Sequence, residues 1–144
     1  ELLETFGVSV VGFKTNNFPS FYSRSSGLSK INRVDSPKEI VETFINNQLL
    51  KLPCSTLVSN PVPIENEILP TEIDSVIKKA LVELKKNQVS GKAVTPFLLD
   101  AIFKETKGKS LETNISLALN NVKLGAKIAK ELNTRTKRSG SKFQ

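Results

Sequence analysis

The chain has 144 residues, of which 38% are hydrophobic and 24% are charged, a composition typical of one soluble folded domain. No apolar run approaches the roughly 18 residues that a membrane helix needs, so we expect no membrane partner and a cytoplasmic location. The sequence contains no histidine and a single cysteine, Cys54, which argues against catalytic triads, zinc sites and an internal disulfide. We expect Cys54 to be a small buried packing residue.

The formal net charge is +7, and it is distributed unevenly. Most of the chain carries only +3, because four basic residues lie among the last twelve: Arg135, Lys137, Arg138 and Lys142. No aromatic residues interleave with the basic ones in a stacking pattern, so we expect no nucleic-acid partner. The sequence therefore predicts a folded body over residues 1–134 and a basic tail or linker over residues 135–144.

The beginning of the chain predicts a helix, a strand and an unusual loop. Residues 1–6 have the composition of the last turns of a helix that ends at Gly7, so we expect the chain to begin within a helix of a longer protein. Residues 8–13 are rich in β-branched residues, which predicts a strand covered on both faces. The loop over residues 16–27 contains three aromatic residues and Arg24, a mixture that indicates a site or an interface.

The next segments predict a helix and a second strand. Residues 36–39 form a capping box with proline at the first helical position, and apolar residues then recur at helical spacing as far as Leu49. Residues 56–58 predict a strand, and two prolines within residues 60–63 prevent it from continuing. Two strands joined through a helix fit a parallel βαβ unit.

The remainder of the chain predicts three helices. A capping box at residues 71–74 begins the first, and its apolar stripe lies opposite lysines that we expect to be solvated: Lys78, Lys79, Lys85 and Lys86. A shorter helix is expected from Thr95 to Gly108, and a long one from a Ser110 cap to about Leu132. The residues alone thus predict an incomplete α/β layered structure with few strands and a helical carboxyl-terminal end.

Six sequence blocks then carry a resemblance. They are residues 4–12 (ETFGVSVVG), 18–27 (FPSFYSRSSG), 33–37 (RVDSP), 60–63 (NPVP) and 91–99 (GKAVTPFLL), followed by Asn114, Asn120 and Asn121. Together and in this order they resemble the pseudouridine-5'-phosphate glycosidase family, also called indigoidine-synthase-A-like. The resemblance covers nearly all of residues 1–132, whereas any single block would be weak evidence.

This resemblance implies a layered α/β/α fold and an enzyme of pseudouridine catabolism. The reaction is the reversible cleavage of the carbon–carbon glycosidic bond of pseudouridine 5'-phosphate, which gives uracil and ribose 5-phosphate. The resemblance also implies a manganese ion (Mn2+), a homotrimer and, in eukaryotic relatives, a fused sugar-kinase domain for which the basic tail would suit the junction.

The resemblance further implies that this chain lacks the residues of the central chemical step. In the family, a lysine forms an imine with the opened ribose while a carboxylic acid handles protons. That lysine, the metal-site aspartate and the proton donor correspond to positions before Glu1. We therefore expect no catalytic or metal-binding residue in this chain, and no activity of the chain alone.

Three residues are candidates for substrate binding. Asn114 and Asn121 share a face of the last predicted helix with Ala118 and Gly125, two residues small enough to leave room for a ligand. An amide can accept from a uracil N–H and donate to a carbonyl, and the resemblance assigns the uracil contact to Asn114. Arg24 could bind phosphate or meet a neighbouring subunit, and the sequence leaves both open.

Other interpretations of the same residues are structural. Asn114 and Asn121 could cap a neighbouring backbone or face water, and Asn120 points to another face of the helix. Residues 60–63 follow a strand where ligands often collect, although we expect them to be scaffolding. The competing hypothesis for the whole chain is a noncatalytic truncated or split subunit that acts as a binding or assembly partner.

Overall fold

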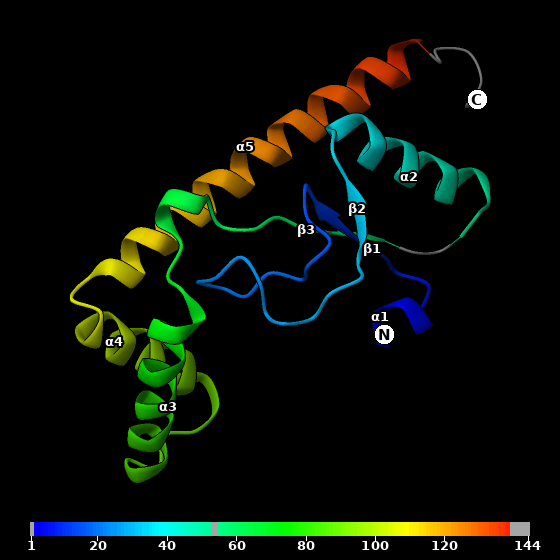
Figure 1. Cartoon of the computed structure of the whole chain (residues 1–144). Helices are drawn as coiled ribbons and strands as arrows, with labels where there is room; N and C mark the ends of the chain where they lie inside the picture. Colours follow the sequence, from blue (N-terminus) through cyan, green and yellow to red (C-terminus); the bar gives the residue numbers. More distant parts are fainter. Residues whose placement is uncertain (1, 53–54, 139–144) are drawn as a thin grey trace.

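The computed structural model describes residues 2–52 and 55–138 (Figure 1). Its sheet consists of three parallel strands in the order β2-β1-β3. The strands are β1 (Ser9–Phe13), β2 (Asn32–Val34) and β3 (Thr56–Ser59). This arrangement confirms the expected α/β class with few strands, and it adds β2, which the sequence did not predict.

Helix α2 (Pro37–Leu49) joins β2 to β3 and crosses over β1. The two predicted strands, β1 and β3, are parallel neighbours as expected, although β2 comes between β1 and α2 in the chain. Its capping box is present: the Glu39 backbone N–H donates to Ser36 Oγ at 3.3 Å, and the Ser36 hydroxyl donates to Glu39 Oε1 at 2.6 Å. The hydrogen bond from Ser36 lowers the pKa of the Glu39 carboxyl. Ile40 and Val41 are buried, so one face of the helix is fixed against the sheet.

Helices make up most of the remaining described chain. A short helix, α1 (Leu2–Thr5), precedes β1. After β3 come α3 (Pro70–Lys86), α4 (Val94–Glu105) and α5 (Lys109–Arg138), with two 3-10 turns, η1 (Ile64–Asn66) before α3 and η2 (Gly91–Ala93) before α4. The four lysines of α3 are exposed, as expected.

Two of the expected helix starts are wrong, whereas one expected stop is confirmed. Helix α3 begins at Pro70, one residue before the expected capping box, because proline suits the first helical position. The residue before it, Leu69, makes no side-chain cap. Ser110 lies inside α5 and does not cap it. Gly108 ends α4 as predicted, with a φ of +90° and its N–H donating to the Phe103 carbonyl at 3.0 Å.

The carboxyl end of α5 differs most from expectation. The helix continues to Arg138, six residues beyond the expected end near Leu132. Arg135 forms ion pairs with Glu42 of α2 and with Glu131, and the hydrogen bond to Glu42 raises the pKa of the Arg135 guanidinium. The first part of the expected basic tail is therefore helical, while residues 139–144, like Cys54, lie outside the described residues.

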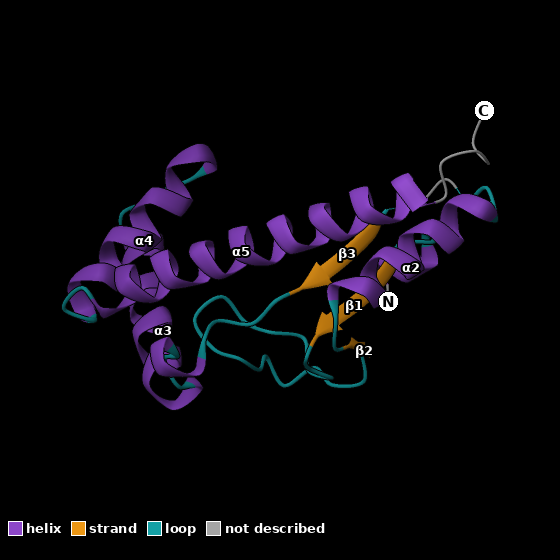
Figure 2. Ribbon diagram, turned by 90° about the horizontal axis from the view of Figure 1, so that it is seen from above, coloured by secondary structure: helices purple, strands orange, loops and turns teal. Residues whose placement is uncertain are grey.

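The buried side chains form two hydrophobic clusters, and α5 extends from the α3–α4 part of the fold to the sheet and α2 (Figures 1 and 2). One joins the sheet, α2 and α5 through these buried residues: Val11, Val34, Ile40 and Leu124. The other joins α3, α4 and the segments before them: Tyr22, Ile68, Ile73, Ala80 and Ile102. The long helix therefore fixes the position of the sheet relative to α3 and α4.

Gly12→Ala should destabilise the fold, because a Cβ at this position would lie 2.3 Å from the Thr15 carbonyl oxygen and 2.7 Å from Ile31 Cδ1. We expect a loss of about 1–3 kcal/mol in the free energy of unfolding, measured by urea denaturation. Gly125→Ala is the matched control, because nothing lies within 4 Å of its added Cβ. Alanine in a helix should there stabilise by up to about 1 kcal/mol. Equal effects of the two changes would contradict the packing described.

Tyr22 should ionise at a higher pH in the folded chain than in the unfolded chain, because burial raises the pKa of its phenol. The unfolded value is about 10, so the stability linked to this group is present below that pH and is lost as the pH rises through the folded pKa. Tyr22 is the single tyrosine and the chain has no tryptophan, so phenolate absorbance near 295 nm reports this residue alone. The same midpoint with and without urea would show that the ring is not buried.

Candidate functional site

The segment that leaves β3, residues 60–68, is held by polar side chains from distant parts of the chain. We call it the exit segment. The Asn120 amide donates to the Pro61 carbonyl at 3.0 Å, and Arg24 Nη1 donates to the Val62 carbonyl at 2.6 Å. The buried Thr113 hydroxyl donates to the Asn66 carbonyl at 2.8 Å. The exit segment is therefore bound to α5 on one side and to the aromatic loop, residues 16–31, on the other.

A second set of bonds fixes the aromatic loop against the end of the exit segment. The Ser23 hydroxyl donates to the Ile68 carbonyl at 2.6 Å, and the Ile68 N–H donates to the Tyr22 carbonyl at 3.0 Å. The backbone N–H of Arg24 donates to Glu67 Oε1 at 2.7 Å. These bonds hold Tyr22 between α4 and α5, where its ring makes an edge contact with Phe21 at 4.8 Å between centroids.

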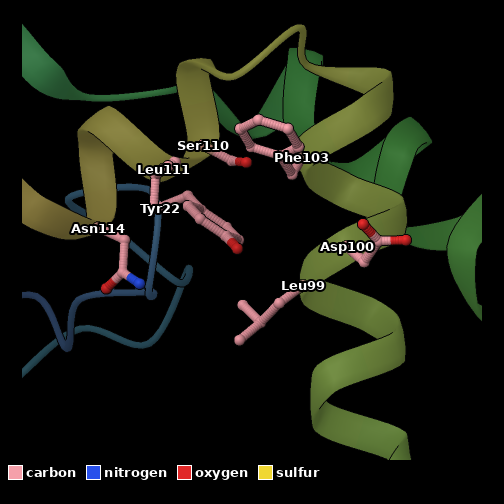
Figure 3. Close-up of a pocket in the computed structure, with 7 residues that line it drawn as sticks. All are labelled: Tyr22, Leu99, Asp100, Phe103, Ser110, Leu111 and Asn114. Atoms are coloured by element: carbon pink, nitrogen blue, oxygen red, sulfur yellow. The ribbon is translucent and has the colours of Figure 1, made fainter.

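A pocket of about 300 Å3 lies where Tyr22 meets α4 and α5. Its walls are mainly apolar, and they are formed by these residues: Tyr22, Leu99, Asp100, Phe103, Ser110, Leu111 and Asn114. Figure 3 shows the Asn114 amide on one side of the Tyr22 ring, with Leu99 and Asp100 on the other. The aromatic loop, α4 and α5 thus each contribute to one cavity.

The chemistry of this pocket suits a flat, neutral ring with polar edges. Apolar walls with a few polar groups are typical of small-molecule sites, and an amide can pair with a ring that offers both an N–H and a carbonyl. The usual pKa of a phenol is about 10 and burial raises that of Tyr22 further, so the hydroxyl is neutral at ordinary pH and can donate a hydrogen bond. Asp100 forms an exposed ion pair with Lys104 at 2.6 Å.

The structure separates the two asparagines that the sequence grouped together. Asn114 lines the pocket, whereas Asn121 lies about 10 Å further along the helix axis and accepts a hydrogen bond from the Asn60 amide at 2.9 Å. Asn120 points elsewhere, as predicted, and it holds the Pro61 carbonyl. Asn121 is thus placed beside the carboxyl end of β3 and outside the pocket of Asn114.

Arg24 has a structural partner that the sequence did not suggest. Its guanidinium holds the Val62 carbonyl, so at least one of its N–H groups is used within the chain. The pocket walls Tyr22, Leu99 and Phe103 were also missed as site residues. The signals that could have found them are the aromatic residues of the loop and the i, i+4 spacing of Leu99 and Phe103 on one helix face.

The described residues offer no group of three or more His, Cys, Asp or Glu side chains that could hold a metal ion. The manganese implied by the resemblance is expected at positions before Glu1 and stays a prediction. Among residues 2–52 and 55–138, no helix is both long and apolar enough to cross a membrane.

Comparison with known proteins gives consistent matches over most of the chain. The family model described as "Indigoidine synthase A like protein" matches residues 1–131. The pseudouridine-5'-phosphate glycosidase of Petrotoga mobilis is 47% identical over 92% of this chain and 44% of its own length, and the Fervidobacterium nodosum protein of the same name is 46% identical over 93% and 45%. The chain spans less than half the length of these relatives and corresponds to their carboxyl-terminal part.

Solved structures agree with these matches. The crystal structure of an indigoidine synthase A-like protein from Thermotoga maritima is 40% identical, with a TM-score of 0.79 over 89% of this chain and 42% of that chain. The prealnumycin C-glycosynthase AlnA, solved with ribulose 5-phosphate, has a TM-score of 0.83 over 94% of this chain and 45% of its own, and at 21% identity it supports the fold alone. The family match, the sequence identity and the shared fold together show that this chain belongs to the indigoidine synthase A-like family.

Proposed function

We propose that the chain forms the carboxyl-terminal part of a pseudouridine-5'-phosphate glycosidase. Relatives with that name are 41–47% identical to it over about nine tenths of its length. The proposed reaction is the reversible conversion of pseudouridine 5'-phosphate to uracil and ribose 5-phosphate. The observation that carries the proposal is the position of Asn114, the resemblance's uracil contact, on the wall of a pocket suited to a pyrimidine.

Asn114 would recognise the edge of uracil in this pocket. Its amide oxygen accepts from a ring N–H, while its amide nitrogen donates to a ring carbonyl. Leu99, Phe103 and Leu111 would contact the flat faces of the ring, and the neutral Tyr22 hydroxyl could donate to a second carbonyl. The pocket would thereby hold the leaving base in one orientation while the bond to ribose breaks.

Arg24 and Asn121 remain further proposed substrate contacts. Both already bind within the chain, Arg24 to the Val62 carbonyl and Asn121 to the Asn60 amide. A guanidinium has five N–H donors, so Arg24 can hold a carbonyl and still meet a phosphate oxygen. Its location in a loop bound to the exit segment would keep such a contact rigid.

The groups that break the bond would come from the rest of the family fold. We propose that the imine-forming lysine, the acidic proton donor and the manganese site lie there, and that this chain contributes binding and orientation. A cytoplasmic homotrimer, with a sugar-kinase domain fused after the basic tail in some relatives, completes the proposal. No chemical step is assigned to a residue of this chain.

The second candidate function is a noncatalytic subunit that only binds or assembles. Uracil binding separates the two functions, because a glycosidase part retains a base pocket that a purely assembling subunit does not need.

The 144-residue chain alone should release no uracil from pseudouridine 5'-phosphate, with or without manganese. The expected reason is that neither Lys14 nor Lys92 lies in the pocket, so no amine is placed to form an imine with ribose there. Uracil release is measured by chromatography with a full-length relative as the positive control. Turnover by the purified chain would show that the reacting lysine is among its own residues.

Asn114→Ala should lower turnover in a full-length glycosidase that contains this chain as its carboxyl-terminal part. Losing an aligned hydrogen bond to the base should cost roughly 1–3 kcal/mol, or about five- to two-hundredfold in kcat/KM. Asn120→Ala is the matched control, because Asn120 holds the Pro61 carbonyl and should affect the free energy of unfolding instead. If both variants lost turnover equally, Asn114 would not be the base contact.

A further inference from the structure

Asn66, the last residue of η1, accepts hydrogen bonds from two hydroxyls of α5. Its backbone carbonyl accepts from the Thr113 hydroxyl at 2.8 Å, and its side-chain Oδ1 accepts from the Ser116 hydroxyl at 2.7 Å. Thr113 is buried and Ser116 is half-buried, so water competes little for these bonds. A single residue of the exit segment thus contacts α5 at two points.

The turn that carries Asn66 is itself held in place. The backbone N–H of Asn66 donates to the Pro63 carbonyl at 3.0 Å, which closes the turn. Pro63 directly precedes η1, and its ring restricts the backbone there to a φ near the observed value of −55°. The exit segment therefore presents both oxygens of Asn66 to α5 in a fixed position.

The Ser116 hydroxyl makes a different kind of bond from other helix hydroxyls of this chain. A serine or threonine inside a helix commonly donates to a carbonyl of its own preceding turn. Thr43, Ser75 and Thr134 each donate to a carbonyl of their own helix. Ser116 instead donates to a side chain 50 positions away in the sequence. Its bond therefore concerns how α5 lies against the exit segment.

The helix geometry relates these two contacts to the candidate pocket. Successive residues of an α-helix point about 100° apart, so Thr113 and Ser116 point about 60° apart, while Asn114 points about 160° away from Ser116. Asn114 lines the pocket with Tyr22 (Figure 3), whereas Ser116 is not among the described residues that line it. Any effect of Ser116 on a base in this pocket must therefore pass through the helix.

Two contacts in different directions resist rotation of the helix, whereas one alone would allow it to pivot. A rotation of about 20° would move an atom that lies about 5 Å from the helix axis by nearly 2 Å. A hydrogen bond does not survive such a displacement, because its donor and acceptor must stay within about 3.2 Å. The direction of the Asn114 amide thus depends on the contacts that α5 makes with Asn66.

We propose that Ser116 and Asn66 are positioning residues for base binding. Their hydrogen bond sets the rotation of α5 so that the Asn114 amide meets the edge of the uracil ring. Neither residue touches the substrate, and both act through Asn114. The inference rests on the proposed function, because it takes Asn114 to be the base contact.

The competing interpretation is that the Ser116–Asn66 bond only stabilises the fold. Its loss would then lower the melting temperature, and any loss of substrate binding would be shared by uracil and ribose 5-phosphate. A positioning role predicts an effect on uracil alone, and one that requires Asn114. These two signatures separate the interpretations.

The test uses a full-length glycosidase that contains this chain, assayed in the direction that joins uracil to ribose 5-phosphate. Ser116→Ala removes the hydroxyl and leaves a good helix former. We expect the KM for uracil to rise about three- to twentyfold, because a displaced amide binds the base poorly, and the KM for ribose 5-phosphate to stay within about twofold. Asn66→Asp keeps an acceptor oxygen and should retain the KM of the parent enzyme for uracil, whereas Asn66→Ala should match Ser116→Ala.

A double-mutant cycle tests whether Ser116 acts through Asn114. In an Asn114→Ala background, Ser116→Ala should change the KM for uracil by less than about twofold, because no amide is left to position. Asn120→Ala is the matched control, since it removes another bond between α5 and the exit segment, at the Pro61 carbonyl. It lies more than a turn beyond Ser116 and should leave the KM for uracil unchanged. Circular dichroism compares the melting temperatures of all variants.

The outcomes separate a failure of the inference from a failure of the proposed function. If Asn114→Ala raises the KM for uracil but Ser116→Ala does not, the positioning role is wrong and the base contact stands. Equal rises in the KM for both substrates, or an undiminished effect of Ser116→Ala without Asn114, would likewise overturn it. If Asn114→Ala leaves the KM for uracil unchanged, the proposed base contact is wrong and the inference falls with it.

Discussion

The structure depends on the capture of the exit-segment carbonyls by side chains from α5 and the aromatic loop. Pro61 and Pro63 lack the N–H that a sheet ladder needs, and β3 ends at Ser59, directly before them. The carbonyls of the exit segment accept instead from the side chains of Asn120, Arg24 and Thr113. A buried carbonyl left without a donor costs about 1–3 kcal/mol, so these three bonds together are large relative to the stability of a domain.

This capture also builds the candidate pocket. Thr113 of α5 lies next to Asn114, and Arg24 lies in the loop that carries Tyr22, so the bonds from these two donors to the exit segment bring the Tyr22 ring toward Asn114. The local structure around Tyr22 or around Asn114 does not by itself bring the two side chains together. An amide on a helix and a ring on a loop become parts of one cavity because a proline-rich segment between them requires donors from both sides.

The sequence predicts features that depend on neighbouring residues and misses those that depend on contacts between distant parts of the chain. The capping box at residues 36–39 and the stop at Gly108 depend on residues within a few positions of each other, and both are present. Strand β2 was missed because its three residues, mostly exposed, have no apolar pattern. The pairing of Asn60 with Asn121 joins residues 61 positions apart, which periodicity on one helix cannot reveal. Asn114 was singled out by its helical spacing and by the resemblance, and its role as a substrate contact stays a prediction. Its neighbours on the pocket wall, Leu99 and Phe103, are brought there by the packing of α4 on α5.

The length of α5 has a consequence for how the molecule can vary. The helix carries Asn114 in the pocket near its start and Ile128 against the hydrophobic cluster of the sheet, about 21 Å further along its axis. Each residue inserted between them would turn one end by about 100° relative to the other, so that either the amide or the apolar face would leave its place. Insertions or deletions in this stretch therefore preserve both contacts only when the number of residues changed is close to a whole number of helical turns. The helix thereby fixes both the distance and the relative rotation between the candidate pocket and the sheet.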